Sequence, residues 1–209
     1  MPEWDDIFAE RGRYFTEPHA DIERVVRVFR DQDVERVLDL GCGTGRHLVY
    51  LAKSNFEVHG FDVSPKALSL AHDWLEEECL TAHLLRHRME DPFPFEDDFF
   101  DAVISTQVLH HNRIDGILFT VSEIERVLRS DGVIFATFPR LSQVPDRGSM
   151  DWKLEPIEPG TYIPRSGPEA GIPHHYFTVE EVDEVFQGFK ILDLYVGHTG
   201  HRCLLGLKK

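Results

Sequence analysis

The sequence predicts an α/β fold in which helices cover both faces of a mostly parallel sheet. Short apolar segments alternate with longer segments whose apolar residues recur at helical spacing, a pattern typical of alternating strands and helices. The stretch RVLDLGCGTGRH places three glycines directly after the first apolar segment. Two strand-like segments, joined by a short turn, end the chain. With 209 residues, 42% of them hydrophobic, we expect one domain with a sizeable core.

Seven segments are typical of strands. The first, RVLDL, is almost wholly apolar, whereas the second, FEVHGFDV, alternates and the third, LTAHLLRHR, is weakly patterned. A short join through Thr199-Gly200 favours an antiparallel C-terminal hairpin. The predicted strands therefore form a seven-stranded, mostly parallel sheet. They cover residues 36–40, 56–63, 80–88, 100–107, 133–138, 189–198 and 201–209.

Helices are predicted between these strands from apolar spacing and from local start signals. Ser64-Pro65 combines an N-cap serine with a proline at the first helical position. Thr178 and Glu181 read as a capping box. The predicted helices cover about 18–30, the end of the glycine loop to about 54, the segment from 65, 114–128, and the segment from 178. Residues 139–173 hold seven prolines and no hydrophobic period, which predicts a long loop.

Composition narrows the possible partners. A formal net charge of −15 disfavours stable binding to nucleic acid or to an anionic membrane. Three unpatterned cysteines and a start without a signal peptide favour a cytoplasmic protein without a disulfide framework. No metal site is expected, because HExxH and CxxC are absent and the adjacent pairs His110-His111 and His174-His175 would turn apart in a helix or strand.

The glycine loop predicts a ligand site at the carboxyl end of the first strand, where open parallel sheets bind ligands. Gly41, Gly43 and Gly45 form G-x-G-x-G, and Arg46 stands where a dinucleotide site has its third glycine. A P-loop would need Gly-Lys-Ser/Thr, which is absent. Asp39, two residues before the first glycine, would repel a pyrophosphate and attract an ammonium group.

A second acid narrows the choice of ligand. Asp62 ends the second strand, 17 residues after Gly45, and can accept hydrogen bonds from both hydroxyls of a ribose. A ligand that offers an amine to Asp39 and a ribose to Asp62, without a phosphate, is S-adenosylmethionine.

These motifs resemble those of the class I S-adenosylmethionine-dependent methyltransferases. VLDLGCGTG resembles the family's first motif and GFDVSPKAL its second. FPFEDDFFDAVISTQVLHH resembles the segment around the fourth strand, and EIERVLRSDGVIFATFP the segment that ends in the fifth. The resemblance covers residues 36–138, and residues 178–209 fit the closing elements. It implies a Rossmann-like sheet and S-adenosylmethionine as cofactor.

The resemblance also implies the roles of individual residues. Asp39 would orient the amino group and Asp62 would hold the ribose. The Met89 amide and Glu90 would contact the adenine, although Arg88 stands where the family has an aspartate. The residues expected to bind the cofactor are Tyr14, Asp39, Gly41, Cys42, Gly43, Gly45, Asp62, Val63, Met89, Glu90, Ser105 and Thr106.

We therefore expect methyl transfer to a small-molecule acceptor within a single domain, residues 1–209. Residues 1–30 would form a helical lid, with Tyr14 of GRYF over the cofactor, and residues 139–177 a loop insertion over the acceptor site. Amino-methylating nucleic-acid enzymes carry Asn/Asp/Ser-Pro-Pro-aromatic after the fourth strand, whereas this chain has STQVLHH.

A catalytic base is needed only if the acceptor atom arrives protonated, and His111 is the candidate for that role. Two other functions remain open. A non-catalytic regulatory protein that binds S-adenosylmethionine would carry the same cofactor motifs. A nicotinamide-dependent oxidoreductase would share the sheet, but Asp39 and the missing third glycine argue against it.

Overall fold

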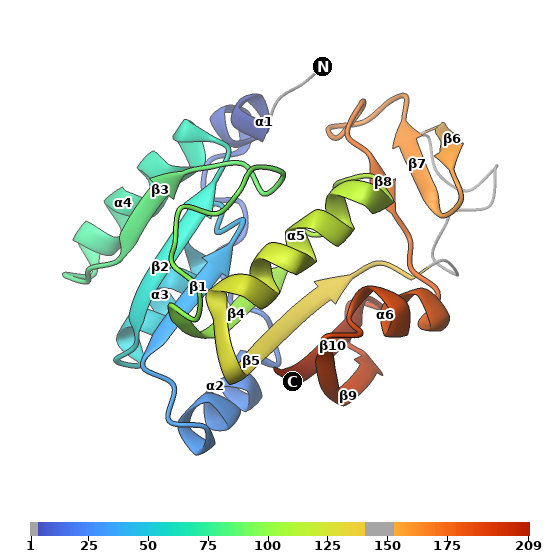
Figure 1. Ribbon diagram of the computed structural model, residues 1–209. Coiled ribbons are helices and arrows are strands. Elements are labelled where there is room, and N and C mark those ends of the chain that lie inside the picture. The colour runs from blue at the N-terminus through green and yellow to red at the C-terminus, as the bar shows by residue number, and fades with distance from the viewer. Residues whose placement is uncertain (1–3, 141–152) are drawn as a thin grey trace.

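Seven strands form a central sheet in the computed structural model, which describes residues 4–140 and 153–209. Their order is β3-β2-β1-β4-β5-β10-β9 (Figure 1). The first five pair in parallel, whereas β10 is antiparallel to both of its neighbours, which confirms the predicted sheet and hairpin. The strands are β1 (Arg36–Leu40), β2 (Glu57–Asp62), β3 (His83–Arg86), β4 (Phe100–Thr106), β5 (Leu128–Phe138), β9 (Phe189–Val196) and β10 (Arg202–Lys208).

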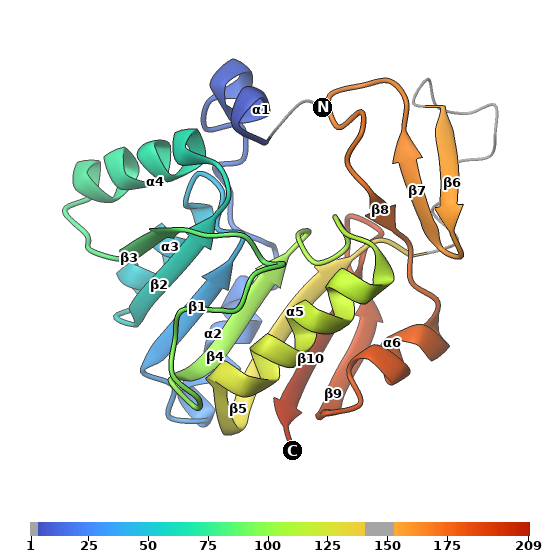
Figure 2. The ribbon, with the colours of Figure 1, turned by 45° about the horizontal axis from the view of Figure 1, so that its top comes forward.

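Helices cover both faces of the sheet, and the buried apolar side chains form one cluster on each side (Figure 2). One face is covered by α2 (Ile22–Asp31), α3 (Arg46–Lys53) and α4 (Pro65–Glu77). The other is covered by α5 (Ile114–Val127) and α6 (Val179–Val185). The apolar stripes of these helices therefore explain why the strands between them are buried on both faces.

Local signals at two helix starts act as the sequence predicts. The Ser64 hydroxyl accepts a hydrogen bond from the Ala67 N–H (3.0 Å), which satisfies a donor at the start of α4. At the start of α6, the Thr178 hydroxyl accepts from the Glu181 N–H while the Glu181 carboxylate accepts from the Thr178 N–H. Both helices are thus fixed by their own first turn.

The fifth strand is longer than predicted. It begins at Leu128, which pairs with Phe100, and the next paired residue is Val133 opposite Ala102. The residues between the predicted helix 114–128 and the predicted strand 133–138 thus form a bulge within β5, and Asp131 has a φ of +59°.

A second, antiparallel sheet takes two of its three strands from the predicted 139–173 loop. Its strands are β6 (Leu154–Glu158), β7 (Thr161–Pro164) and β8 (His174–His175), in that order. The prediction of a loop was wrong for these residues, because the prolines among them were interpreted as residues that interrupt strands. Pro156 lies on an edge strand, where a missing N–H is tolerated, and Gly160, with a φ of +75°, helps to turn β6 into β7. Residues 141–152 of that predicted loop lie outside the described residues.

The N-terminal segment docks on α4 through polar contacts. Asp5 in α1 (Trp4–Arg11) accepts hydrogen bonds from the Ser64 hydroxyl and the Lys66 N–H, both at 2.7 Å. Arg13 forms a two-point ion pair with Glu77 at 2.5 and 2.6 Å. This segment thus lies beside the carboxyl ends of the parallel strands. Within the described ranges, the structure contains no helix with the length and apolar character of a membrane span.

Candidate cofactor and acceptor site

The glycine loop after β1 is a tight left-handed turn. Gly41, Gly43 and Gly45 have φ angles of +69°, +53° and +93°. A Cβ on Gly41 would lie 2.5 Å from two methyl groups of Val108, and one on Gly45 would lie 3.0 Å from the Ala71 Cβ. Glycine is therefore required at both positions by backbone conformation and by space. The loop leads directly into α3, so its backbone borders a helix N-terminus.

Asp62 ties this loop to the start of α4. One carboxylate oxygen accepts from the Gly43 N–H and the other from the Ser64 N–H, each at 2.9 Å. Burial raises the pKa of Asp62, and the two N–H donors oppose that shift. Each oxygen has a further lone pair, so the carboxylate can also accept from a ligand hydroxyl. Cys42 is buried between the glycines, and burial raises the pKa of its thiol well above the ordinary value.

Asp39 is the least satisfied acid in the site. It is 1% exposed, and its Oδ2 has no hydrogen-bond partner among the described residues. Burial raises the pKa of Asp39 to about 7, and the charge of Arg46 opposes the shift. An isolated buried carboxylate is unfavourable, so such a group calls for a donor. An ammonium group beside the glycine loop would supply both the donors and the opposite charge.

Ser105 and Thr106 lie at the end of β4, as the sequence predicts. The Ser105 hydroxyl is buried without a hydrogen-bond partner in the described part of the chain. Thr106 instead bonds Nδ1 of His47 (3.2 Å), whose Nε2 accepts from the His19 N–H (3.1 Å). Since Nε2 accepts, the His47 proton is on Nδ1 and is donated to Thr106. His47 is not among the site residues that the sequence predicts, because a histidine inside a helical apolar stripe gives no distinctive signal.

The predicted adenine side lies at the carboxyl ends of β2 and β3. Val63 follows Asp62 and lines a cavity of about 260 Å³, whose other lining residues are Arg86, His87, Arg88 and Asp91. Met89 and Glu90 come next in the chain. The Met89 carbonyl accepts from the Thr120 hydroxyl (2.9 Å), and Glu90 is exposed and paired with Arg88.

Tyr14 and the glycine loop have no described contact, and other aromatics of the N-terminal segment face the site. The Tyr14 ring is 60% exposed, with Arg11 and Phe15 as its neighbours. A Cβ on Gly43 would meet the Phe8 ring at 3.6 Å, and the Trp4 ring lies 4.7 Å from that of His111. The spacing of Trp4 and Phe8, four residues apart on one helix, was the signal that could have identified them.

His111 belongs to a cluster of three histidines. Its ring centroid lies 3.9 Å from that of His110 and 4.8 Å from that of His174. The prediction that the two adjacent histidines would turn apart was wrong, because they lie in the turn after β4 and not in a helix or strand. Burial lowers the pKa of His111 to about 3, with a further contribution from His174. Burial would raise the pKa of Glu169, but its 2.6 Å contact with His174 lowers it on balance.

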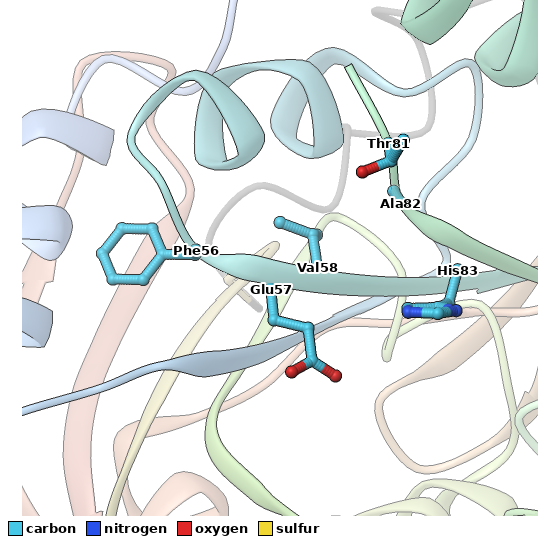
Figure 3. A pocket seen from close by; sticks show the side chains of 6 residues that line it. All are labelled: Phe56, Glu57, Val58, Thr81, Ala82 and His83. Atoms are coloured by element: carbon cyan, nitrogen blue, oxygen red, sulfur yellow. The ribbon is translucent and has the colours of Figure 1, made fainter.

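A separate cavity of about 330 Å³ lies at the amino ends of the parallel strands, opposite the ends that carry the glycine loop. Its lining comes from the amino ends of β2 and β3, and Figure 3 shows Glu57 and His83 on the same side of this strand pair. Parallel strands carry the glycine loop and both aspartates at their carboxyl ends, so this cavity is not part of the candidate site.

Comparisons with known proteins agree with this geometry. Residues 37–132 match the methyltransferase domain family. The uncharacterized methyltransferase sll0829 of Synechocystis sp. is 36% identical over 99 residues, which cover 47% of this chain and 44% of that protein. A probable tRNA methyltransferase 9B of Mus musculus is 31% identical over 131 residues, which cover 60% of this chain and 27% of that protein. The matches thus span less than half the length of these curated relatives.

Structural similarity extends over nearly the whole chain. A SAM-dependent methyltransferase from Methanosarcina mazei superposes with a TM-score of 0.72 at 20% identity, covering 92% of this chain and 98% of that one. At this identity the likeness establishes the fold. The chain therefore has the fold of these methyltransferases, and its residues 37–132 are similar to the methyltransferase domain family.

Proposed function

We propose that the protein transfers a methyl group from S-adenosylmethionine to a small-molecule acceptor. The observation that carries the proposal is Asp39, a buried carboxylate with an unpartnered oxygen beside a left-handed glycine loop. The cofactor's amino group would satisfy Asp39, and its ribose hydroxyls would bond Asp62. The backbone at Gly41, Gly43 and Gly45, with Cys42 between them, would face the methionyl and ribose parts.

The remaining cofactor contacts are proposed on the same basis. The cavity beside Val63 is the proposed adenine site, and the Met89 amide and Glu90, which come between its lining residues Arg88 and Asp91 in the chain, are the proposed adenine contacts. Ser105, whose hydroxyl has no partner among the described residues, and Thr106 would lie near the methionyl end. Tyr14 would cover the cofactor only if the exposed N-terminal segment closes further over the site.

The bound cofactor supplies an activated methyl group on a sulfonium, and transfer is an in-line displacement that requires alignment and exclusion of water. The chain's own contribution is to orient the cofactor through its strand ends and to enclose the acceptor. The rings of Trp4 in α1 and His174 in β8 both lie against the ring of His111. We propose that the acceptor binds beside His111.

Two classes of molecule are candidates for the methyl acceptor. In the single domain we propose, α1 and the segment around β6–β8 enclose the acceptor. One relative is named as a probable tRNA methyltransferase, which suggests an RNA acceptor as the second candidate. The net charge of −15 favours the small molecule, because RNA binding needs a basic surface.

Calorimetric titration with S-adenosylmethionine, its demethylated product and NAD(H) tests the cofactor assignment. We expect the first two to bind at micromolar affinity or better and NAD(H) not to bind. Asp39→Asn keeps the shape of the side chain but removes the charge that faces the ammonium group. We expect it to weaken binding by about tenfold to a hundredfold, as for the loss of a charged hydrogen-bond partner.

Asp31→Asn is the matched control, since Asp31 is an exposed acid at the end of α2, away from the glycine loop. It should bind the cofactor like the wild type. Binding of NAD(H) alone would replace the methyltransferase with an oxidoreductase. Tight cofactor binding without turnover of any acceptor in a broad screen would favour the non-catalytic regulatory protein.

A further inference from the structure

Three histidines from two distant parts of the chain meet on the acceptor side of the proposed cofactor site. His110 and His111 lie in the turn after β4, and His174 comes from β8 in the second sheet. The His175 N–H donates to the His110 carbonyl at 2.8 Å, which fixes β8 against this turn. One ring nitrogen from each of the three lies within 4.8 Å of those of the other two.

The cluster contains a buried nitrogen that the protein does not satisfy. His110 is 5% exposed, and its Nδ1 has no hydrogen-bond partner among the described residues. The ring of His111 packs between those of Trp4, His110 and His174. A buried polar atom without a partner is rare in native proteins, so a bound ligand would give His110 Nδ1 the partner that it lacks among the described residues.

The third histidine faces two acceptors. Nδ1 of His174 lies 2.9 Å from the Ile172 carbonyl, and Nε2 lies 2.6 Å from a carboxylate oxygen of Glu169. A neutral imidazole has one N–H, so it can donate to only one of these oxygens. A donation from Nδ1 to a backbone carbonyl is the usual support of a metal-binding histidine. With the proton on Nδ1, the Nε2 lone pair faces a carboxylate, and either a second proton or a bound cation satisfies that arrangement.

We propose that His110, His111 and His174 bind a first-row divalent transition-metal ion, with the Glu169 carboxylate beside it. Imidazole ligands suit zinc, iron, cobalt, nickel and copper, whereas magnesium and calcium prefer sites built from oxygen ligands. Three histidines with one further position are typical of catalytic zinc sites, in which the last position takes water or substrate.

The site deepens the proposed function by indicating the acceptor class, and this step rests on that proposal. A hydroxyl or thiol of the acceptor would occupy the open position and release its proton to water, because a bound metal ion lowers the pKa of its ligand. The oxygen or sulfur lone pair would then form the bond to the methyl carbon. The C–S bond of the sulfonium would break with its electron pair on sulfur, and the oxidation state of the metal would not change.

Metal binding is measured on the full chain without S-adenosylmethionine. After removal of metal with a chelator, the protein is titrated with Co²⁺, followed by visible absorption, and with Zn²⁺ in competition with a chromophoric chelator. We expect one equivalent of each ion to bind. His174→Gln should weaken binding by at least about tenfold, while His72→Gln, in the exposed His72-Asp73-Glu76 group of α4, should bind like the wild type.

Calorimetry with S-adenosylmethionine accompanies each variant, because cofactor binding reports an intact fold independently of the metal. Glu169→Gln is the second variant if His174→Gln does not fold, and we expect weaker metal binding there as well. If the wild type takes up no stoichiometric metal while it binds the cofactor, the metal site is wrong and the proposed function stands. If His174→Gln and Glu169→Gln both bind metal as the wild type does, the ion binds elsewhere and the proposed three-histidine site is wrong.

Discussion

At the scale of single residues, the two strand-end aspartates differ in what the protein provides for them. Asp62 accepts one backbone N–H on each oxygen, whereas Oδ2 of Asp39 has no partner among the described residues. Both carboxylates are buried. Asp62 therefore holds the loop in place with or without a ligand, and Asp39 gains most when a cation binds.

This difference predicts how stability depends on pH in the ligand-free protein. The pKa of Asp39 is about 7 in the folded state against an ordinary value of 3.8. Between these values the folded state keeps a proton that the unfolded state has lost, so this group's contribution to stability falls as pH rises from about 4 to about 7. The whole shift corresponds to a loss on the order of 4 kcal/mol.

Urea unfolding at about pH 5 and about pH 8 measures the effect, because the midpoint reports the free energy of unfolding. The wild type should lose more stability across this range than Asp39→Asn, in which the group does not titrate. Asp31→Asn should follow the wild type. Parallel curves for the wild type and Asp39→Asn would show that Asp39 is not the group responsible.

At the scale of elements, α1 is attached differently from the other helices. None of its residues is fully buried, whereas α2 to α6 each bury apolar side chains in the core. Two polar contacts hold it against α4. Asp5 of α1 accepts hydrogen bonds from the first residues of α4, and Arg13, just after α1, pairs with Glu77 at the end of α4. Elements with few buried apolar contacts open at low free energy, which suits a cover over a ligand.

Asp5→Ala removes the acceptor for the Ser64 hydroxyl and the Lys66 N–H. We expect amide hydrogen exchange in residues 4–11 to become about fivefold faster or more, because the open state of α1 becomes more populated. The start of α4 should change little, since the Ser64 hydroxyl still caps it. Glu10→Ala, at an exposed position of the same helix, is the control. Unchanged exchange in Asp5→Ala would show that other contacts hold α1.

Elements with local signals could be predicted from the sequence, and elements built by distant pairing could not. Ser64-Pro65 and the Thr178 capping box specify helix starts within a few residues. Asp39 and Asp62 could be singled out because topology alone brings the ends of parallel strands to one edge. The β6–β8 sheet depends instead on pairings such as Tyr162 with His174, which no local pattern reveals.

The histidine cluster shows the same limit within the site. His110 and His111 could be placed after β4, but the approach of His174 depends on how β8 folds back. The reasoning from regular helix and strand geometry failed there because the pair lies in a turn.

At the scale of the whole molecule, charge and topology favour the same class of acceptor. The chain has a net charge of −15, and its candidate site lies at the carboxyl ends of the parallel strands. Arg86 and Arg88 beside the proposed adenine cavity give a local positive group, but Asp91 lines the same cavity. A long-range field of this sign repels a polyanion and leaves a small neutral or cationic acceptor unaffected.

We therefore expect no saturable binding of bulk tRNA at about 0.15 M salt, with any residual dissociation constant weaker than about 10⁻⁴ M, the weak end of non-specific binding. Filter binding or fluorescence anisotropy measures it, in the presence and absence of the demethylated cofactor product, and a basic RNA-binding protein serves as the positive control. Lowering the salt to about 0.02 M should not produce tight binding, because counterion release strengthens RNA binding only where basic side chains contact the phosphates. Saturable binding that weakens steeply as salt is added would instead reveal a basic contact surface and make RNA the acceptor. Methyl transfer to a small hydroxyl or thiol compound, together with no RNA binding, would assign the site to the small molecule.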